Sequence, residues 1–235
     1  MKKKPLSRNA YFSAAVIIFI YMLAMIFKGY LFQIFPATEE GPLEEVSRIG
    51  IPPLLLSSFL MLILSFAILY PVLVICKYHY TTSPIAAIII FLGIFFSSLT
   101  EIILEARYLF RMVLVLGPML RNTDGPHLRE DVMREVDNFL NLRRNLNFPV
   151  TVAQIISSIM LVVTFSRQLK INLLIRLAFG INAVYMIIHL GCLFMSLYEP
   201  INYNSTLHLP IALFIYGLVL VWFIRMPYLT RSGGD

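Results

Sequence analysis

Two carboxylates inside an otherwise hydrophobic stretch are the residues whose chemistry stands out in this chain. Glu101 and Glu105 lie in the apolar run 85–111. Their spacing of four places them on one face of a helix, and Tyr108 follows on the same face. A charged side chain in a bilayer costs roughly 2.5–3.5 kcal/mol on insertion scales, so such a residue usually faces a bundle interior or a water-filled cavity. There the pair could bind a ligand or act as general acid and base.

The composition indicates the environment of these carboxylates. The chain has 235 residues, of which 59% are hydrophobic and only 14% are charged, and its mean hydropathy is +0.80. A soluble domain typically contains about 25% charged residues. The chain is therefore predicted to be an integral membrane protein, with membrane lipid around it and no separate soluble domain. The basic residues flank apolar runs rather than forming a patch with aromatic residues, so we expect no nucleic acid partner.

Six apolar segments are long enough to cross a membrane as helices. They occupy residues 11–35, 51–76, 85–107, 150–166, 171–198 and 209–224. We therefore predict an all-α, polytopic bundle that comprises residues 1–235 as a single domain.

The segment between the third and fourth spans is predicted to lie outside the membrane. Residues 112–120 are apolar but too short to span, and could extend the third helix, lie in the interface or re-enter the bilayer. After a turn, apolar residues recur at helical spacing over 128–147, which predicts an amphipathic helix. We favour packing over the mouth of the bundle as its role, and the alternative is binding of a partner protein.

The distribution of Lys and Arg predicts the orientation. Basic residues gather at the N-terminus, at Lys77, in the turn at Arg167 and Lys170, and at Arg225. With six spans, all four segments lie on one side. By the positive-inside rule, both termini of this multi-pass cell membrane protein are expected in the cytoplasm.

With this orientation, polar residues of several spans fall at a similar depth in the outer half of the membrane. The fifth span carries a polar stripe with spacings of three and four that includes Asn182, Tyr185 and His189. The fourth span contributes Gln154. Serines on these faces usually bond to the helix backbone, so they are weaker candidates. We predict an outward-facing ligand cavity formed by Glu101, Glu105, Tyr108, Gln154, Tyr185 and His189.

Several kinds of chemistry lack their sequence signature. The chain contains no H-E-x-x-H, no G-x-S-x-G and no P-loop. His79, His127 and His208 are expected in loops at different depths, so neither a bis-histidine haem nor a metal site is predicted. Cys76 and Cys192 lie in apolar runs and are expected to be buried thiols. No cofactor is indicated.

Three functions remain open. The first is a sensor or transporter that binds a small molecule, lipid or ion in the cavity. The second is an intramembrane enzyme that uses Glu101, Glu105 and His189 for acid–base catalysis. The third is a structural subunit of a larger membrane complex.

Short motifs at the ends of the spans carry a resemblance to a known family. The motifs are Arg48-Ile49-Gly50, Leu69-Tyr70, Ala153-Gln154-Ile155, the basic turn before Arg176, and Trp222 in the last span. In these the chain resembles a family of six-helix bacterial membrane proteins catalogued as domain of unknown function 4386. The resemblance implies a six-helix fold and supplies no activity.

Overall fold

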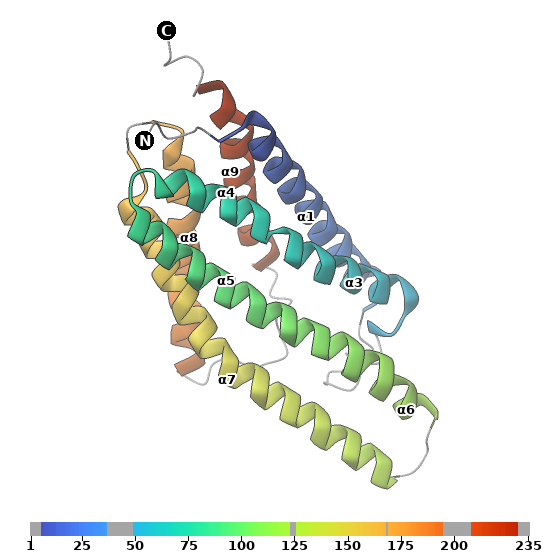
Figure 1. Ribbon diagram of the computed structural model, residues 1–235. Coiled ribbons are helices and arrows are strands. Elements are labelled where there is room, and N and C mark those ends of the chain that lie inside the picture. The colour runs from blue at the N-terminus through green and yellow to red at the C-terminus, as the bar shows by residue number, and fades with distance from the viewer. Residues whose placement is uncertain (1–5, 37–48, 123–125, 168, 195–207, 230–235) are drawn as a thin grey trace.

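The chain is helical throughout the part that the structure describes. The computed structural model describes residues 6–36, 49–122, 126–167, 169–194 and 208–229. No strand occurs within these ranges, which confirms the all-α class (Figure 1). Within them, six helical segments are long and apolar enough to cross a membrane.

Two of these segments consist of more than one helix. The first is α1 (Arg8–Ile34), and the second is α3 (Pro52–Ala67) followed by α4 (Leu69–Tyr80). The third joins α5 (Pro84–Arg107), the π-helix η1 (Tyr108–Leu116) and α6 (Gly117–Asn122). The remaining three are α7 (Pro126–Thr164), α8 (Asn172–Phe194) and α9 (His208–Leu229).

Helix ends follow from local chemistry. The Ser7 hydroxyl accepts a hydrogen bond from the Ala10 N–H at 3.3 Å and caps α1. The break between α3 and α4 at Ile68 comes three residues before Pro71. A proline has no N–H and its ring collides with the carbonyl four residues earlier, here that of Ala67, so the helix is interrupted at this point.

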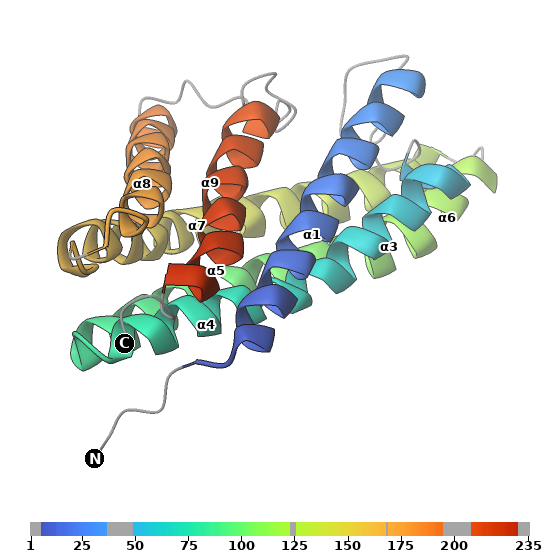
Figure 2. The same ribbon diagram turned by 90° about the horizontal axis from the view of Figure 1, so that it is seen from above.

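The six segments form a closed ring in chain order. Each packs against the next, and α9 returns to pack against α1. Figures 1 and 2 show α1 and α9 side by side, with the start of α1 and the end of α9 at the same end of the molecule. We call this the termini end, and the opposite end, where α5 and α7 extend past the other helices, the hairpin end.

An aromatic cluster fills the ring at the termini end. Trp222 of α9 is fully buried and contacts Tyr11 and Tyr78 edge-on, with ring centroids 5.8 and 5.4 Å apart. Phe165 and Phe223 complete the cluster. Aromatic rings bury large areas in preferred edge-to-face contacts, so this cluster closes the ring at the termini end.

The region between the third and fourth spans differs from the prediction. The separate helices predicted at 128–147 and 150–166 are one continuous helix, α7, with Pro149 inside it. A proline inside a helix destabilises it by about 3 kcal/mol. Both halves of α7 nevertheless pack on the same neighbour, the segment formed by α5 and η1. On the N-terminal side of Pro149, Val136 and Phe139 pack on Met112. On the C-terminal side, the Val150 carbonyl accepts a hydrogen bond from α5. This shared tertiary packing overrides the local break.

The same packing accounts for residues 112–120. Of the three alternatives, they extend the third helix, mostly as η1. Met112 and Leu116 are buried against the apolar face of α7. The amphipathic face predicted at 128–147 thus packs along η1 rather than over the mouth of the bundle.

A cavity at the centre of the helix ring

A cavity of about 270 Å³ lies inside the ring. All six segments line it, through α1, α4, α5, α7, α8 and α9, together with Ile68 between α3 and α4. Ile18, Ile75 and Val219 belong both to its wall and to the core cluster of the termini end. The aromatic cluster therefore forms the floor of the cavity.

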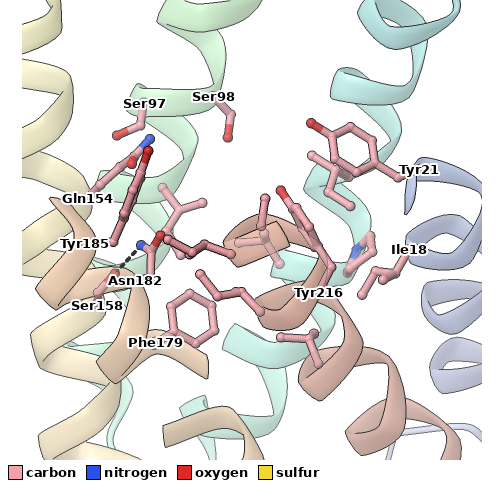
Figure 3. A pocket seen from close by; sticks show the side chains of 18 of the residues that line it. Ile18, Tyr21, Ser97, Ser98, Gln154, Ser158, Phe179, Asn182, Tyr185 and Tyr216 are labelled. Carbon is pink, nitrogen blue, oxygen red and sulfur yellow. Dashed lines mark hydrogen bonds between the residues drawn. The ribbon is translucent and has the colours of Figure 1, made fainter. Parts of the chain in front are cut away.

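One wall of the cavity is polar (Figure 3). Its residues come from α5, α7 and α8, and are Ser97, Ser98, Gln154, Ser158, Asn182 and Tyr185. The Asn182 amide donates a hydrogen bond to Ser158 Oγ at 2.9 Å. Ser97 Oγ donates to the Gly93 carbonyl at 2.9 Å, so part of this wall bonds to the helix backbone. In the part of the chain that the structure describes, the Ser98 hydroxyl and the Gln154 amide have no hydrogen bond, so both are available to a bound molecule.

The polar wall depends on a close approach of α5 to α7 at Gly93. A β-carbon at this position would collide with Ser157 Oγ and would lie 3.2 Å from the Ala153 carbonyl oxygen. Small residues allow helix backbones to approach closely. The absence of a side chain at Gly93 therefore sets the distance between the serines of α5 and the polar residues of α7.

The facing wall is formed by two tyrosines and by aliphatic side chains. Tyr21 of α1 and Tyr216 of α9 contact each other edge-on, with ring centroids 5.2 Å apart. Ile18 lies below Tyr21 and beside Tyr216 in Figure 3, whereas Phe179 lies below Asn182 on the other side of the cavity. The cavity thus has one side of amides and hydroxyls and a facing side that is mainly aromatic and aliphatic, apart from the two tyrosine hydroxyls.

A histidine joins the cavity at the start of α9. A hydrogen bond of 2.7 Å links Tyr185 Oη and His208 Nδ1, and both residues line the cavity. The prediction that His208 lies in a loop is wrong, because α9 begins at this residue. Pro210 does not prevent this start, since the N–H that a proline lacks has no partner in the first helical turn.

The other two histidines also lie in helices. His79 is in the last turn of α4, where it is buried and its Nε2 lies 2.9 Å from Thr164 Oγ1. His127 belongs to α7. Each was predicted in a loop, because polar residues at the ends of apolar runs resemble loop sequence while the helices continue past the apolar part.

The residues predicted to form one site divide into two places. Gln154 and Tyr185 line the cavity, whereas Glu101, Glu105 and Tyr108 are not among its lining residues. Glu105 forms an ion pair with Arg143 of α7 at 3.4 Å. The Tyr108 ring stacks on Phe139, with centroids 5.8 Å apart.

The two remaining candidates lie one helical turn beyond the cavity wall. Glu101 is three residues beyond Ser98 on α5, and His189 is four residues beyond Tyr185 on α8. Both side chains are half-buried. The structure therefore places the glutamates between the cavity and the hairpin end, next to Arg143.

The tyrosine wall and His208 were not among the predicted site residues. Tyr21 and Tyr216 are polar groups within the first and last spans. Their common depth was a usable signal, but only if the ring closes by pairing the first span with the last.

Metal binding has no support in the part of the chain that the structure describes. No group of three or more His, Cys, Asp or Glu side chains comes together there. Cys76 and Cys192 are free thiols, the former buried and the latter half-buried.

No protein-family model, no curated protein and no solved structure matches this chain. The resemblance to a six-helix bacterial family stays a prediction, and the function is inferred from the geometry of the cavity.

Proposed function

We propose that the chain is a multi-pass membrane protein whose helix ring binds a small uncharged amphiphile, as a sensor or transporter does. Membrane insertion is supported by the outer surface of the ring. Large apolar side chains there are strongly exposed, among them Leu56 at 70%, Ile85 at 74% and Val163 at 65%. Such a surface is unfavourable in water and fits a hydrocarbon environment.

The charge distribution supports an orientation with both termini in the cytoplasm. The described acidic residues all lie toward the hairpin end, on α5 and α7. The charged residues described at the termini end are all basic, namely Arg8, Lys77, Arg167, Lys170, Arg176 and Arg225. The hairpin end also carries arginines, on α5, η1, α6 and α7, so the support for this orientation comes from the short basic loops of the termini end and from the absence of described acidic residues there.

The length of α7 supports an external hairpin. Its 39 residues extend about 58 Å at 1.5 Å per residue, against roughly 30 Å for the hydrocarbon core of a bilayer. The part of α7 that carries charged residues would therefore project outside the cell together with η1 and α6.

The class of ligand is inferred from the lining of the cavity. Among the described lining residues none is Asp, Glu, Lys or Arg. An ion in so apolar a site would lack a counter-charge, which is costly. A neutral molecule with a hydroxyl or amide group could bond to Asn182 and Gln154 while its hydrocarbon part contacts Phe179. The volume is close to the lower limit for small-molecule pockets, roughly 300–1,000 Å³.

The alternative of an intramembrane enzyme has less support. Its acid–base residues would be Glu101, Glu105 and His189, which do not line the cavity. Glu105 is engaged by Arg143. A ligand in the cavity would therefore not contact these groups.

Matched ligands and matched variants test the proposed ligand class. In nanodiscs, 1-decanol should raise the melting temperature of the protein, and decanoate, with the same chain length but a charge, should not. Asn182→Leu should abolish the effect of decanol, whereas Glu101→Gln should preserve it. Stabilisation by decanoate alone, or loss of binding only in Glu101→Gln, would contradict the neutral cavity and favour the carboxylate site.

Cysteine labelling tests the orientation. In a Cys76→Ala, Cys192→Ala background, a cysteine at Asn204 should react with an impermeant reagent on intact cells, and one at Lys3 should not. Both probes lie outside the described residues. Labelling at Lys3 would reverse the orientation.

A further inference from the structure

A second hollow lies on the outside of the ring at the termini end. It is an open groove of about 690 Å³ between the beginning of α8 and the end of α9. Its lining residues are Lys170, Ile171, Leu174, Val221, Arg225, Tyr228 and Leu229. None of them lines the central cavity, so the groove is a separate candidate site.

Two cations face this groove without a carboxylate partner among the described residues. Lys170 and Arg225 are exposed, and the ion pairs within the described ranges involve neither of them. The described acidic residues all lie toward the opposite end, on α5 and α7. The groove therefore attracts an anion from outside the chain.

A third cation stands at the edge of the groove. The Arg8 guanidinium lies over the Tyr228 ring, 5.3 Å from its centroid, and donates a hydrogen bond to the Tyr228 hydroxyl at 3.3 Å. This contact adds positive charge next to Arg225. It also occupies one of the two faces of the tyrosine ring, on which a quaternary ammonium group could otherwise form a cation–π contact.

The rest of the groove is hydrocarbon. Ile171 and Leu174 of the α8 side face Val221 of α9 across it, and Val221 is 41% exposed. An inorganic anion would leave these side chains uncovered. A ligand that combines an anionic group with an alkyl chain would satisfy both parts of the groove.

We propose that this groove binds an anionic phospholipid of the inner leaflet, with the phosphate between Lys170 and Arg225 and an acyl chain along Leu174 and Val221. Basic pockets between helices on the cytoplasmic side are suited to such headgroups. The proposal depends on the membrane insertion and orientation proposed above, but not on the ligand of the central cavity. A zwitterionic choline lipid would bring a cation toward three arginine and lysine side chains, and is disfavoured.

Native mass spectrometry of the unmodified protein gives the first test. The protein is released from micelles that contain equimolar phosphatidylglycerol and phosphatidylcholine. Each basic residue near the membrane surface raises the affinity for an anionic lipid roughly fivefold, so two cations should give a preference on the order of thirtyfold for phosphatidylglycerol. Equal occupancy by the two lipids would overturn the proposal.

Charge-matched double variants localise the effect. Lys170→Gln with Arg225→Gln should reduce the preference to near parity. Lys77→Gln with Arg167→Gln removes the same charge from the same end, outside the groove lining, and should keep the preference. Equal loss in both double variants would mean a diffuse surface potential and would overturn the specific site.

Two further measurements separate phosphate from lipid and this groove from the cavity. Inorganic phosphate at the same concentration should not displace phosphatidylglycerol, and displacement would reduce the site to an anion site without lipid. The groove variants should keep stabilisation by 1-decanol. If 1-decanol stabilises none of the variants while the preference for phosphatidylglycerol holds, only the proposed cavity ligand is wrong. If 1-decanol stabilises the protein but the preference for phosphatidylglycerol is absent, only the groove proposal is refuted.

Discussion

Two asparagines about three turns apart on α8 show how the two levels of the ring use the same side chain differently. Asn172, at the termini end, is fully buried and has three hydrogen bonds. It donates to Tyr78 Oη and to the Ser166 carbonyl, and its Oδ1 accepts from Trp222 Nε1 at 3.1 Å. Asn182, in the cavity wall, has one recorded bond, to Ser158.

The difference separates polar groups that fix the fold from those that face the cavity. All hydrogen-bonding groups of the Asn172 side chain are used by the chain itself, so this residue connects α4, α8 and α9. Asn182 keeps hydrogen-bonding capacity and faces open space. Polarity within an apolar bundle is thus not in itself a sign of function, and the number of satisfied bonds is the better criterion.

The largest expected effect is at the termini end. Asn172→Ala should lower the free energy of unfolding by about 3 kcal/mol, because the buried Trp222 N–H and the partly buried Tyr78 hydroxyl both lose a partner. Denaturant titration in detergent measures the loss. A variant as stable as the original would contradict the structural role of this network.

The next effect tests what holds the polar wall in place. Gly93→Ala should destabilise the protein by about 2 kcal/mol, because the new methyl group forces apart a packed contact. Ser157→Ala in the same chain should restore part of the loss, which a double-mutant cycle measures.

Gly217→Ala is the control for that experiment. A β-carbon at Gly217 meets no atom within 4 Å, and alanine favours the helix by up to about 1 kcal/mol. This variant should be as stable as the original or more so. Similar losses at both glycines would indicate a backbone effect instead of the contact with Ser157.

A smaller stability effect is expected in the cavity wall. Asn182→Ala removes one partly buried hydrogen bond, so the free energy of unfolding should fall by only about 1 kcal/mol. The affinity for 1-decanol should fall roughly tenfold if the amide bonds to the ligand. Melting curves with and without decanol measure both quantities. A loss as large as that of Asn172→Ala would remove the contrast between the two asparagines.

The smallest effects belong to the hairpin end. Arg143→Gln breaks the ion pair with Glu105, in which the Arg143 side chain is 23% exposed and the Glu105 side chain 36%. The free energy of unfolding should fall by about 0.5 kcal/mol. Arg134→Gln breaks the more exposed pair with Asp131 and should have no measurable effect. A large loss in Arg143→Gln, in the same denaturant titration, would show that Glu105 is a buried structural charge.

Much of the fold could be predicted from the sequence, because six apolar runs of roughly the length that a membrane-spanning helix needs leave few alternatives to a helical bundle. The continuity of α7 through Pro149 could not be predicted in the same way. The rule that proline ends helices is local, whereas the packing of α7 on η1 joins residues distant in the chain, such as Val136 and Met112.

The candidate site was predicted only in part. The spacing of Glu101 and Glu105 correctly identified a shared helical face, but spacing carries no information on what that face meets. The register between α5 and α7 brings Arg143 next to Glu105 and puts Ser97 beside Gln154 in the cavity wall. A shift of one turn between these helices would have placed Glu101 in the cavity wall instead.

The contact at Gly93 also constrains the gene. Any change in the first two bases of a glycine codon substitutes a larger residue or stops the chain, and at this position every larger residue meets Ser157. Selection should therefore permit only silent third-base changes at codon 93, whereas codon 217 is free to diverge. Among divergent copies of this gene, glycine at 93 should persist together with a small residue at 157, and that pair would mark descent even where the apolar spans have lost all recognisable similarity.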